Sequence, residues 1–483
     1  MIRDALRLLG YQYRRRDARV GGGTCRARID DALMPVSVLY KSVNCAMTDQ
    51  PILIAGAGIG GLAAALGLAQ KGRDVIVLEK SSRLGEIGAG IQLGPNAFHS
   101  FDYLGVGHAA RAMAVFIDQL RLTDAMTGEE IVSIPLDEPF RKRFGNPYAV
   151  VHRGDLHGVL LTACRGNDKI DLKVNSEVLS YEQDGTTVTA RLSSGVSVSG
   201  SALIGADGLW SNVRKQVVGD AAPRISGHTS YRSVIATEQM PAELRWNAAT
   251  LWAGPKCHIV HYPLSGWKVF NLVVTYHNDA PEPVAGLPVA QQEVLKGFMH
   301  VHERAQQIIR HGADWKQWVL CDREPVENWV QGRVTLLGDA AHPMLQYFAQ
   351  GACMALEDAV CLAHWVDAYR HDTEAALEAY RAQRLLRTAR SVAIAGDRST
   401  HLSPRGGPRR SSERDAPQQD RQGLLRRAAM ALWRHRANRT RNCVVGPNLP
   451  APRHRPARPP VDGDVADLLR RPRLVRRPVD AIE

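Results

Sequence analysis

Short apolar runs alternate with amphipathic stretches in the first half of the chain. The run at 52–55 has the length and composition of a buried parallel strand, and residues 62–71 carry apolar side chains at helical spacing. A second strand is expected at 74–78, shortly after Gly72. Strand, turn, helix and strand in this order predict an α/β unit built on a parallel sheet.

The pattern changes towards the C-terminal half. Apolar strands are expected at 202–205 and 334–337, and each is followed by a turn and a helix. In the segment between these two strands, 257–263 and 268–274 are strand-like and predict a second sheet. A helix is predicted over 375–390. Its Arg381, Arg384 and Arg387 recur at three-residue spacing, so we expect them on a solvated face.

The positive charge of the chain lies at its two ends. The formal net charge is +12, but residues 1–46 carry +5 and residues 398–483 carry +12, which leaves −5 for residues 47–397. An acidic central segment argues against nucleic acid as its partner. The 483 residues, 45% of them hydrophobic, are enough for a large buried core.

Both ends are expected to be foreign to the fold. Residues 398–483 contain twenty arginines, no lysine and one aromatic side chain, Trp433, so they have little to bury. Such a composition is typical of GC-rich DNA translated out of frame, and we place a frameshift near residues 391–393. Met47 directly precedes the first strand as a natural start would, so residues 1–46 are interpreted as a non-native extension. A basic tail for anionic partners and a solvated, disordered tail are the alternatives.

Several classes of protein are excluded or disfavoured. No run of about 18 apolar residues occurs, so a membrane span is not expected. Residues 1–46 lack the apolar core of a secretory signal. The eight cysteines form no C-x-x-C pair, and no metal-ligand cluster or serine nucleophile motif appears. A cytoplasmic protein with reduced thiols and no bound metal is the prediction.

A glycine-rich turn follows the first strand and predicts a dinucleotide site. Its motif is Gly56, Gly58, Gly60 and Gly61, in which the first permits a tight turn, the second lets the backbone approach a pyrophosphate, and the last allows close helix packing. Glu79 ends the second strand about 20 residues later, where it can accept from ribose hydroxyls. The motif alone leaves FAD and NAD open.

Two further strand ends favour FAD. Asp207 and Gly208 follow one strand, and Gly338 and Asp339 follow another, ahead of a helix that opens at Gly351. Each alone could be a surface turn, but three such ends in one chain indicate one extended cofactor. Asp339 would hold the ribityl chain of a flavin, and the helix N-terminus would favour the anionic reduced flavin.

These three motifs, in this order and spacing, resemble the single-component flavoprotein aromatic hydroxylases of the p-hydroxybenzoate and salicylate hydroxylase group. The resemblance covers about residues 47–390. The segments 88–96, 152–156, 322–329 and 337–359 look closest to 3-hydroxybenzoate 6-hydroxylases. It implies that Glu79, Lys80, Gln92, Arg153 and Asp339 contact FAD, with a surface salt bridge as the alternative for Arg153.

The resemblance also implies the fold class and its boundaries. We expect an α/β protein with a Rossmann-like FAD-binding domain of the p-hydroxybenzoate hydroxylase type and an interleaved β-sheet substrate domain. The FAD-binding parts are 47–118, 150–222 and 330–390, the substrate parts are 119–149 and 223–329, and the tail is 391–483.

His258 and Tyr262 are the candidates for substrate chemistry. On a strand they share one face while His261 points away, so both can line one pocket. In the resembling hydroxylases a His and a Tyr at these positions, with a Gln matching Gln346, contact the phenol. We expect His258 to take or polarise the phenolic proton. The alternatives are a hydrogen-bonded His258–Tyr262 pair and, for His342, a helix cap.

The implied reaction is para-hydroxylation of 3-hydroxybenzoate to gentisate with NADH and O2 through a flavin C4a-hydroperoxide. With only one G-x-G-x-x-G motif, NADH is expected to visit transiently. Hydroxylation of salicylate or of 6-hydroxynicotinate, or an inactive flavin-binding protein with an altered C-terminus, are the alternatives. The sequence leaves open NADH against NADPH and whether a homodimer forms.

Overall fold

The computed structural model describes residues 50–85 and 90–401, with side chains to residue 396. The predicted extension at 1–46, the start at Met47 and the tail beyond 401 lie outside these ranges. Helix α12 (Thr373–His401) includes the first residues assigned to the tail, and there Ser391, Val392 and Ala395 are buried. The boundary expected at 391 therefore falls inside a packed helix.

A six-stranded sheet forms the first layer of the fold. Its order is β19-β20-β12-β1-β2-β8, and every pair is parallel except β19 with β20. The strands are β1 (Ile52–Ala55), β2 (Val75–Leu78), β8 (Ile170–Lys173), β12 (Ala202–Gly205), β19 (Val330–Gln331) and β20 (Val334–Leu336). The three predicted strand ends thus belong to neighbouring strands.

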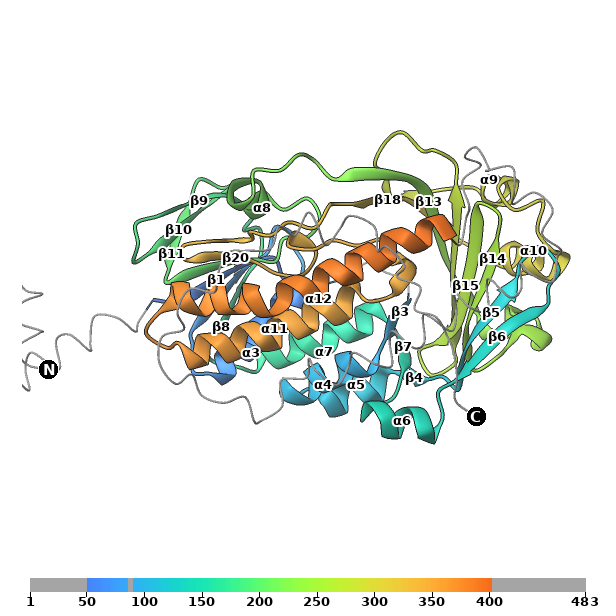
Figure 1. The fold of residues 1–483 in the computed structure, drawn as a ribbon, viewed down its shortest axis with the longest axis horizontal. Coiled ribbons are helices and arrows are strands. Elements are labelled where there is room, and N and C mark those ends of the chain that lie inside the picture. The colour runs from blue at the N-terminus through green and yellow to red at the C-terminus, as the bar shows by residue number, and fades with distance from the viewer. Residues whose placement is uncertain (1–49, 86–89, 402–483) are drawn as a thin grey trace, which may run out of the picture. The chain divides into compact units, whose positions relative to one another are not determined.

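Both faces of this sheet are covered, which explains why its strands are apolar throughout. Ile52 and Ile54 of β1 pack into a core with the helices α3 (Ile59–Gln70), α4 (Pro95–Tyr103), α7 (Arg153–Arg165), α11 (Gly351–Ala368) and α12. Leu53 and Ala55 face the opposite side. They pack against β9 (Val178–Gln183), β10 (Val188–Leu192) and α8 (Asn212–Val217). Figure 1 shows α11 and α12 side by side over the first face.

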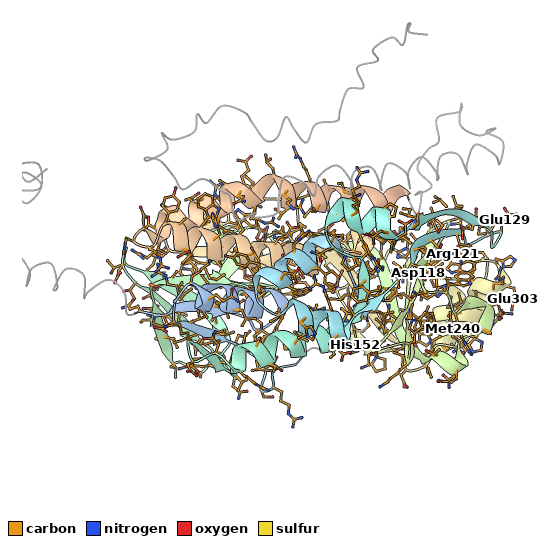
Figure 2. All side chains as sticks on the ribbon, turned by 90° about the horizontal axis from the view of Figure 1, so that it is seen from below. Asp118, Arg121, Glu129, His152, Met240 and Glu303 are labelled. Carbon is orange, nitrogen blue, oxygen red and sulfur yellow. The ribbon has the colours of Figure 1, made fainter. Side chains whose placement is uncertain are left out.

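A second, eight-stranded sheet has the order β17-β18-β13-β16-β15-β14-β5-β6. Its strands are β5 (Gln119–Asp124), β6 (Glu130–Pro135), β13 (Arg224–Ala236), β14 (Ala248–Gly254), β15 (Cys257–Leu264), β16 (Val269–His277), β17 (Ala285–Pro288) and β18 (Lys316–Asp322). Asp118, Arg121 and Glu129, labelled in Figure 2, lie on or beside β5 and β6. One face packs on α9 (Gln291–Lys296) and α10 (Glu303–Arg310).

A small sheet links the first two. It contains β3 (Gly90–Leu93), β7 (Ala149–His152) and β4 (Val115–Phe116), and it is accompanied by α5 (Gly107–Met113) and α6 (Glu138–Phe144). The Gly90 N–H donates to Oδ1 of Asn271 on β16 at 2.8 Å. A Cβ at Gly90 would lie 2.5 Å from Cε2 of Tyr262 on β15, so only glycine allows this approach. Over the described ranges, no helix is long and apolar enough to cross a membrane.

Candidate active site

The glycine turn between β1 and α3 is packed too closely for side chains. Gly56 has φ +102°, and a Cβ there would lie 2.5 Å from the Ala206 carbonyl oxygen. A Cβ at Gly61 would overlap the carbonyl oxygen of Gly56, and one at Gly60 would lie 2.8 Å from Cδ2 of Leu337. Gly58 is the N-cap of α3. The first N–H groups of α3 therefore stand at the carboxyl end of β1, where an anion can bind.

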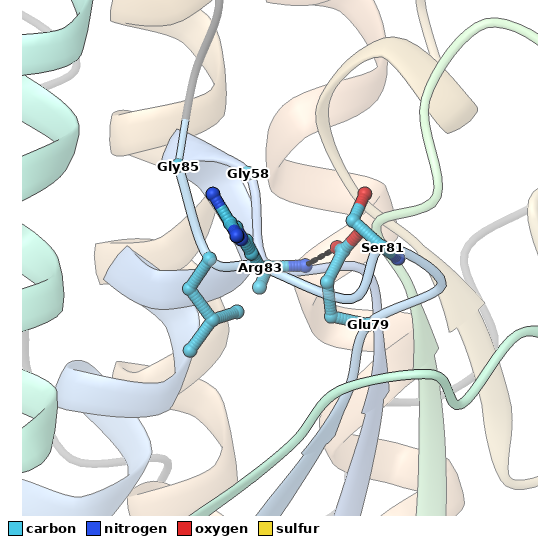
Figure 3. A pocket seen from close by; sticks show the side chains of 7 residues that line it. Gly58, Glu79, Ser81, Arg83 and Gly85 are labelled. Carbon is cyan, nitrogen blue, oxygen red and sulfur yellow. Dashed lines mark hydrogen bonds between the residues drawn. The ribbon is translucent and has the colours of Figure 1, made fainter.

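Glu79 lies beside this turn at the end of β2. Its carboxylate accepts hydrogen bonds from the Ala57 N–H at 2.8 Å and the Ser81 N–H at 2.9 Å. Burial opposes ionisation, but these hydrogen bonds lower the pKa of Glu79 below its usual value. A pocket of about 200 Å³ opens here between Gly58, Glu79, Arg83 and their neighbours, as Figure 3 shows. Lys80, the next residue, is exposed.

Asp207 has a local partner that the sequence did not predict. Its carboxylate accepts from the Ser211 hydroxyl at 2.5 Å and from the Asn212 N–H at 2.8 Å. It therefore holds the N-terminus of α8, and burial raises its pKa. Gly208, with φ +78° and no atom within 4 Å of the position a Cβ would take, makes the turn that leads into this helix.

The third turn presents Asp339 next to α11. The Gly338 N–H donates to Oδ2 of Asp358 of α11 at 3.1 Å, and this hydrogen bond holds the turn against α11. Asp339 itself is exposed and makes no hydrogen bond or ion pair with a described residue. A Cβ at Gly351, the first residue of α11, would lie 3.9 Å from its Oδ1. A carboxylate and a helix N-terminus thus stand side by side.

Gln92 and Arg153 approach from the small sheet. Gln92 lies on β3, and its Oε1 accepts from the Tyr148 hydroxyl at 2.6 Å. Arg153 is the first residue of α7, directly after β7. Both residues predicted to contact the cofactor therefore lie on elements other than those that carry the glycine turn and the Gly338 turn.

His258 and Tyr262 lie on the face of the large sheet that is turned away from α9 and α10. Both are buried on β15, and His261, between them, packs on the other face against Trp252 and Phe270. This is the arrangement that strand alternation predicts. His258 and Tyr262 stand four residues apart, and no hydrogen bond joins these two described side chains, so the paired alternative does not hold.

His258 has an enclosed ring nitrogen without a partner. Its Nδ1 is shielded from solvent and contacts no donor or acceptor of a described residue, and the ring lies 5.0 Å from that of Tyr347. Burial, together with the charge of His228, lowers the pKa of His258 to about 3. The imidazole is therefore neutral near pH 7 and can accept a hydrogen bond from a phenol.

Gln346 meets the same face from the loop before α11. Its Nε2 donates to Oγ1 of Thr275 at 2.9 Å and to Oγ of Ser230 at 3.2 Å. Thr275 is the cross-strand neighbour of His258. The structure therefore places Gln346, from a loop more than eighty residues later, beside the strand neighbour of His258, while Tyr262 shares this sheet face four residues further along β15.

Comparison with known proteins identifies the family. The family described as FAD binding domain matches residues 49–395. The chain is 58% identical over 339 residues to 3-hydroxybenzoate 6-hydroxylase 1 of Aquipseudomonas alcaligenes, covering 70% of this chain and 86% of that protein. The chain belongs to the FAD-dependent aromatic hydroxylases.

Other relatives agree with this membership. The 3-hydroxybenzoate 6-hydroxylase of Polaromonas naphthalenivorans is 50% identical and covers 71% of this chain and 86% of its own length. Klebsiella pneumoniae HpxO complexed with FAD and uric acid superposes with TM-score 0.68 at 26% identity, over 84% of this hydroxylase and 99% of that chain. A salicylate hydroxylase substrate complex, at 21% identity and TM-score 0.68, shares the fold over 83% of this chain and 99% of its own. The predicted fold class and FAD cofactor are confirmed.

The residues of this hydroxylase fit FAD. The Gly56–Gly61 turn leaves room for backbone N–H groups to approach a pyrophosphate, and the exposed Asp339 carboxylate is unused by the protein. The three turns end neighbouring parallel strands, because Ala206 N–H donates to the Ala55 carbonyl and Leu337 N–H donates to the Gly205 carbonyl. One extended ligand can therefore touch all three.

Two expectations about charged side chains were wrong. Arg384 is not on a solvated face: it is 3% exposed and donates to Asp358 and Glu357. His342 caps no helix, because its Nε2 is hydrogen-bonded to Oδ2 of Asp358 at 2.6 Å and both side chains are buried. Arg387 is not on a solvated face either, because its side chain is only 18% exposed and donates to the buried Glu357. Arg381 is partly exposed.

Sequence reasoning missed Arg232 and Tyr347 in this hydroxylase. Arg232 lies on β13 and donates from Nη2 to Oε1 of Gln346 at 3.2 Å. Tyr347 places its hydroxyl 2.6 Å from Nδ1 of His228. An arginine between the buried Tyr231 and Ser233 of β13 was the available signal for Arg232, whereas nothing local marks Tyr347 beyond its place next to Gln346.

Proposed function

We propose that this protein hydroxylates 3-hydroxybenzoate para to its hydroxyl group, giving gentisate, with NADH as reductant and O2 as oxidant. The observation that carries the proposal is the neutral His258, whose enclosed Nδ1 lacks a partner on the same sheet face as Tyr262 and Gln346. Three relatives between 47% and 58% identical bear the name 3-hydroxybenzoate 6-hydroxylase.

Each site residue has a proposed role. Glu79 binds the ribose of FAD, the Gly56–Gly61 turn its pyrophosphate, and Asp339 its ribityl chain, with Lys80, Gln92, Arg153, Asp207 and the Gly338 and Gly351 backbone completing the contacts. Bound FAD, once reduced, supplies the activated oxygen. The domain boundaries predicted from sequence are proposed on the same footing, except the one at 391, which falls inside α12.

The chain's own work is done on the phenol. His258 accepts the hydrogen bond of the phenolic hydroxyl and raises the electron density of the ring at the para carbon. Since burial keeps the pKa of His258 low, polarising the hydroxyl is favoured over forming a free imidazolium. Tyr262 and Gln346 orient the ring. Burial raises the pKa of Tyr262, so its hydroxyl stays a donor.

The test is oxygen-dependent NADH oxidation with a panel of hydroxybenzoates, followed by identification of the product. Stimulation by 3-hydroxybenzoate with gentisate formed in proportion to NADH supports the proposal. Bound flavin without substrate-stimulated oxidation would instead indicate an inactive flavin-binding protein. Replacing NADH by NADPH decides the reductant. NADH and O2 are both available in the cytoplasm, where we place the reaction.

A second candidate is hydroxylation of another aromatic acid. A 6-hydroxynicotinate 3-monooxygenase of Pseudomonas fluorescens is 31% identical over 366 residues. Salicylate and 6-hydroxynicotinate therefore belong in the panel. Faster turnover of either compound would identify it, and not 3-hydroxybenzoate, as the preferred substrate.

A further inference from the structure

Arg232 faces the same space as His258 and Tyr262. On the large sheet Arg232 lies opposite Val273, and Val273 lies opposite Val260, the residue midway between His258 and Tyr262. Directly opposed residues of antiparallel strands point to the same face. Two strand spacings separate Arg232 from Val260, about 10 Å. The guanidinium therefore stands across the sheet face from the proposed phenol-binding residues.

The positive charge of Arg232 has no acidic partner. Its Nη2 donates to the neutral amide of Gln346, its guanidinium lies 4.9 Å from the ring centroid of Trp318, and its Nε is enclosed without a partner. No carboxylate of a described residue pairs with it. The charge that acts on it most, after burial, is the like charge of Arg153, and both lower its pKa.

Arg232 is half-buried. The fully buried arginines of the described chain are all compensated. Arg214 donates to Asp220 at 2.7 Å, Arg323 donates to the same carboxylate at 3.0 Å, and Arg384 donates to Asp358 at 2.6 Å. A guanidinium stays protonated even when it is largely withdrawn from water, so a half-buried one without a counter-charge loses hydration that no ion pair replaces. Arg232 departs from the rule that the rest of this chain follows, and an anionic ligand would remove the cost.

We propose that Arg232 binds the carboxylate of the aromatic acid substrate and selects acids over neutral phenols. The proposal rests on the proposed function, since it takes the phenol to lie against His258. A guanidinium matches a carboxylate with two parallel N–H donors, and among the described residues only Gln346 accepts from the guanidinium of Arg232. Holding the carboxylate at Arg232 and the hydroxyl at His258 fixes which edge of the ring is hydroxylated.

The test measures dissociation constants of two probes with the flavin-containing full chain, from the change in flavin absorbance without NADH. The probes are 3-hydroxybenzoate and 3-hydroxybenzyl alcohol, which keeps the ring and the hydroxyl but has no charge. Arg232→Met should raise Kd for the acid about 10²–10³-fold, as the loss of one partner of an enclosed charge pair does. Kd for the alcohol should change less than about twofold. Arg232→Lys should lie between the wild type and Arg232→Met for the acid.

Arg224→Met is the matched control. Arg224 lies on the same strand but is exposed and pairs with Asp322, so this variant should bind both probes as the wild type does. Equal weakening of both probes by Arg232→Met, or no weakening of the acid, would overturn the proposal. Loss of flavin from both Arg232 variants would also overturn it, because the guanidinium would then serve the cofactor. If the wild type binds no aromatic acid of the panel, the proposed function fails and the assignment of Arg232 fails with it.

Discussion

Nε of Arg384 lies 2.6 Å from Oδ1 of Asp358, and both side chains are buried between α11 and α12. The other carboxylate oxygen of Asp358 accepts from the Gly338 N–H and lies 2.6 Å from Nε2 of His342. Burial alone would raise the pKa of Asp358, but the charges of His342 and Arg384 lower this pKa to about 2. This carboxylate ties the last long helix to the turn that presents Asp339.

Arg384→Met should therefore weaken both the fold and flavin binding. Removing one partner of a buried ion pair leaves an uncompensated charge and costs about 3–5 kcal/mol of unfolding free energy. Urea denaturation and the flavin content of the purified protein measure the two effects. Arg381→Met, at a partly exposed position of the same helix, should cost less than about 1 kcal/mol. Equal effects of the two substitutions would show that the buried pair has no special role.

Gly61→Ala should abolish FAD binding. The added Cβ would overlap the Gly56 carbonyl oxygen, so the turn that faces the pyrophosphate must shift. The control is Gly158→Ala in α7, where nothing lies within 4 Å and where alanine should stabilise the helix by about 0.5–1 kcal/mol. Flavin released on heat denaturation gives the occupancy of each variant. Full occupancy in Gly61→Ala would contradict the close packing.

Asp339→Ala should remove FAD without unfolding the protein. Asp339 is exposed and its side chain makes no hydrogen bond or ion pair with a described residue, so its loss should leave the packing of the chain intact. The flavin content should fall while the circular dichroism spectrum and the melting temperature of the flavin-free protein match those of the flavin-free wild type. A variant that keeps stoichiometric flavin would remove Asp339 from the cofactor site.

His258→Ala should separate NADH oxidation from hydroxylation. Flavin reduction needs no group on the phenol, but ring attack loses its hydrogen-bond acceptor, and general-base assistance is worth about 10²–10⁴-fold. We expect NADH oxidation to continue with release of hydrogen peroxide in place of hydroxylated product. Stopped-flow reduction and product yield per NADH measure the two steps. An unchanged yield would refute the role of His258.

His261→Leu should make the protein less sensitive to acid. His261 is buried with both ring nitrogens unpartnered among the described residues, and burial, with the charge of Arg121, lowers its pKa to about 3. Between pH 6.5 and about 3 the unfolded chain binds a proton that the folded chain does not. The wild type therefore loses about 1.4 kcal/mol per pH unit from this group as the pH falls.

Melting temperatures of wild type and His261→Leu at pH 7.5 and pH 5 test this expectation. The melting temperature of the variant relative to that of the wild type should be higher at pH 5 than at pH 7.5, because leucine keeps the apolar contacts with Trp252 and Phe270 and takes up no proton. The same pH dependence in both proteins would mean that His261 is hydrated or paired in solution.

The sequence by itself determined the features that depend on neighbouring residues along the chain. The apolar run at β1, the glycine turn and Glu79 lie within thirty residues, and each has a backbone reason that neighbouring residues enforce, such as the Cβ-free approach at Gly56 and Gly61. Strand alternation likewise separated His258 from His261, since the two faces of a strand follow from its geometry alone.

Tertiary structure decided the state of the charged side chains. Three-residue spacing placed Arg384 on a solvated face, but its surroundings depend on Glu357 and Asp358 of another helix. Arg232 belongs to no sequence motif. Its distinguishing property is that no acidic side chain pairs with it, and this property is defined only after the strands of the large sheet have paired. Helical or strand periodicity fixes the direction of a side chain. The packed neighbours fix its charge balance, and this is why the candidate carboxylate site became visible only in the folded chain.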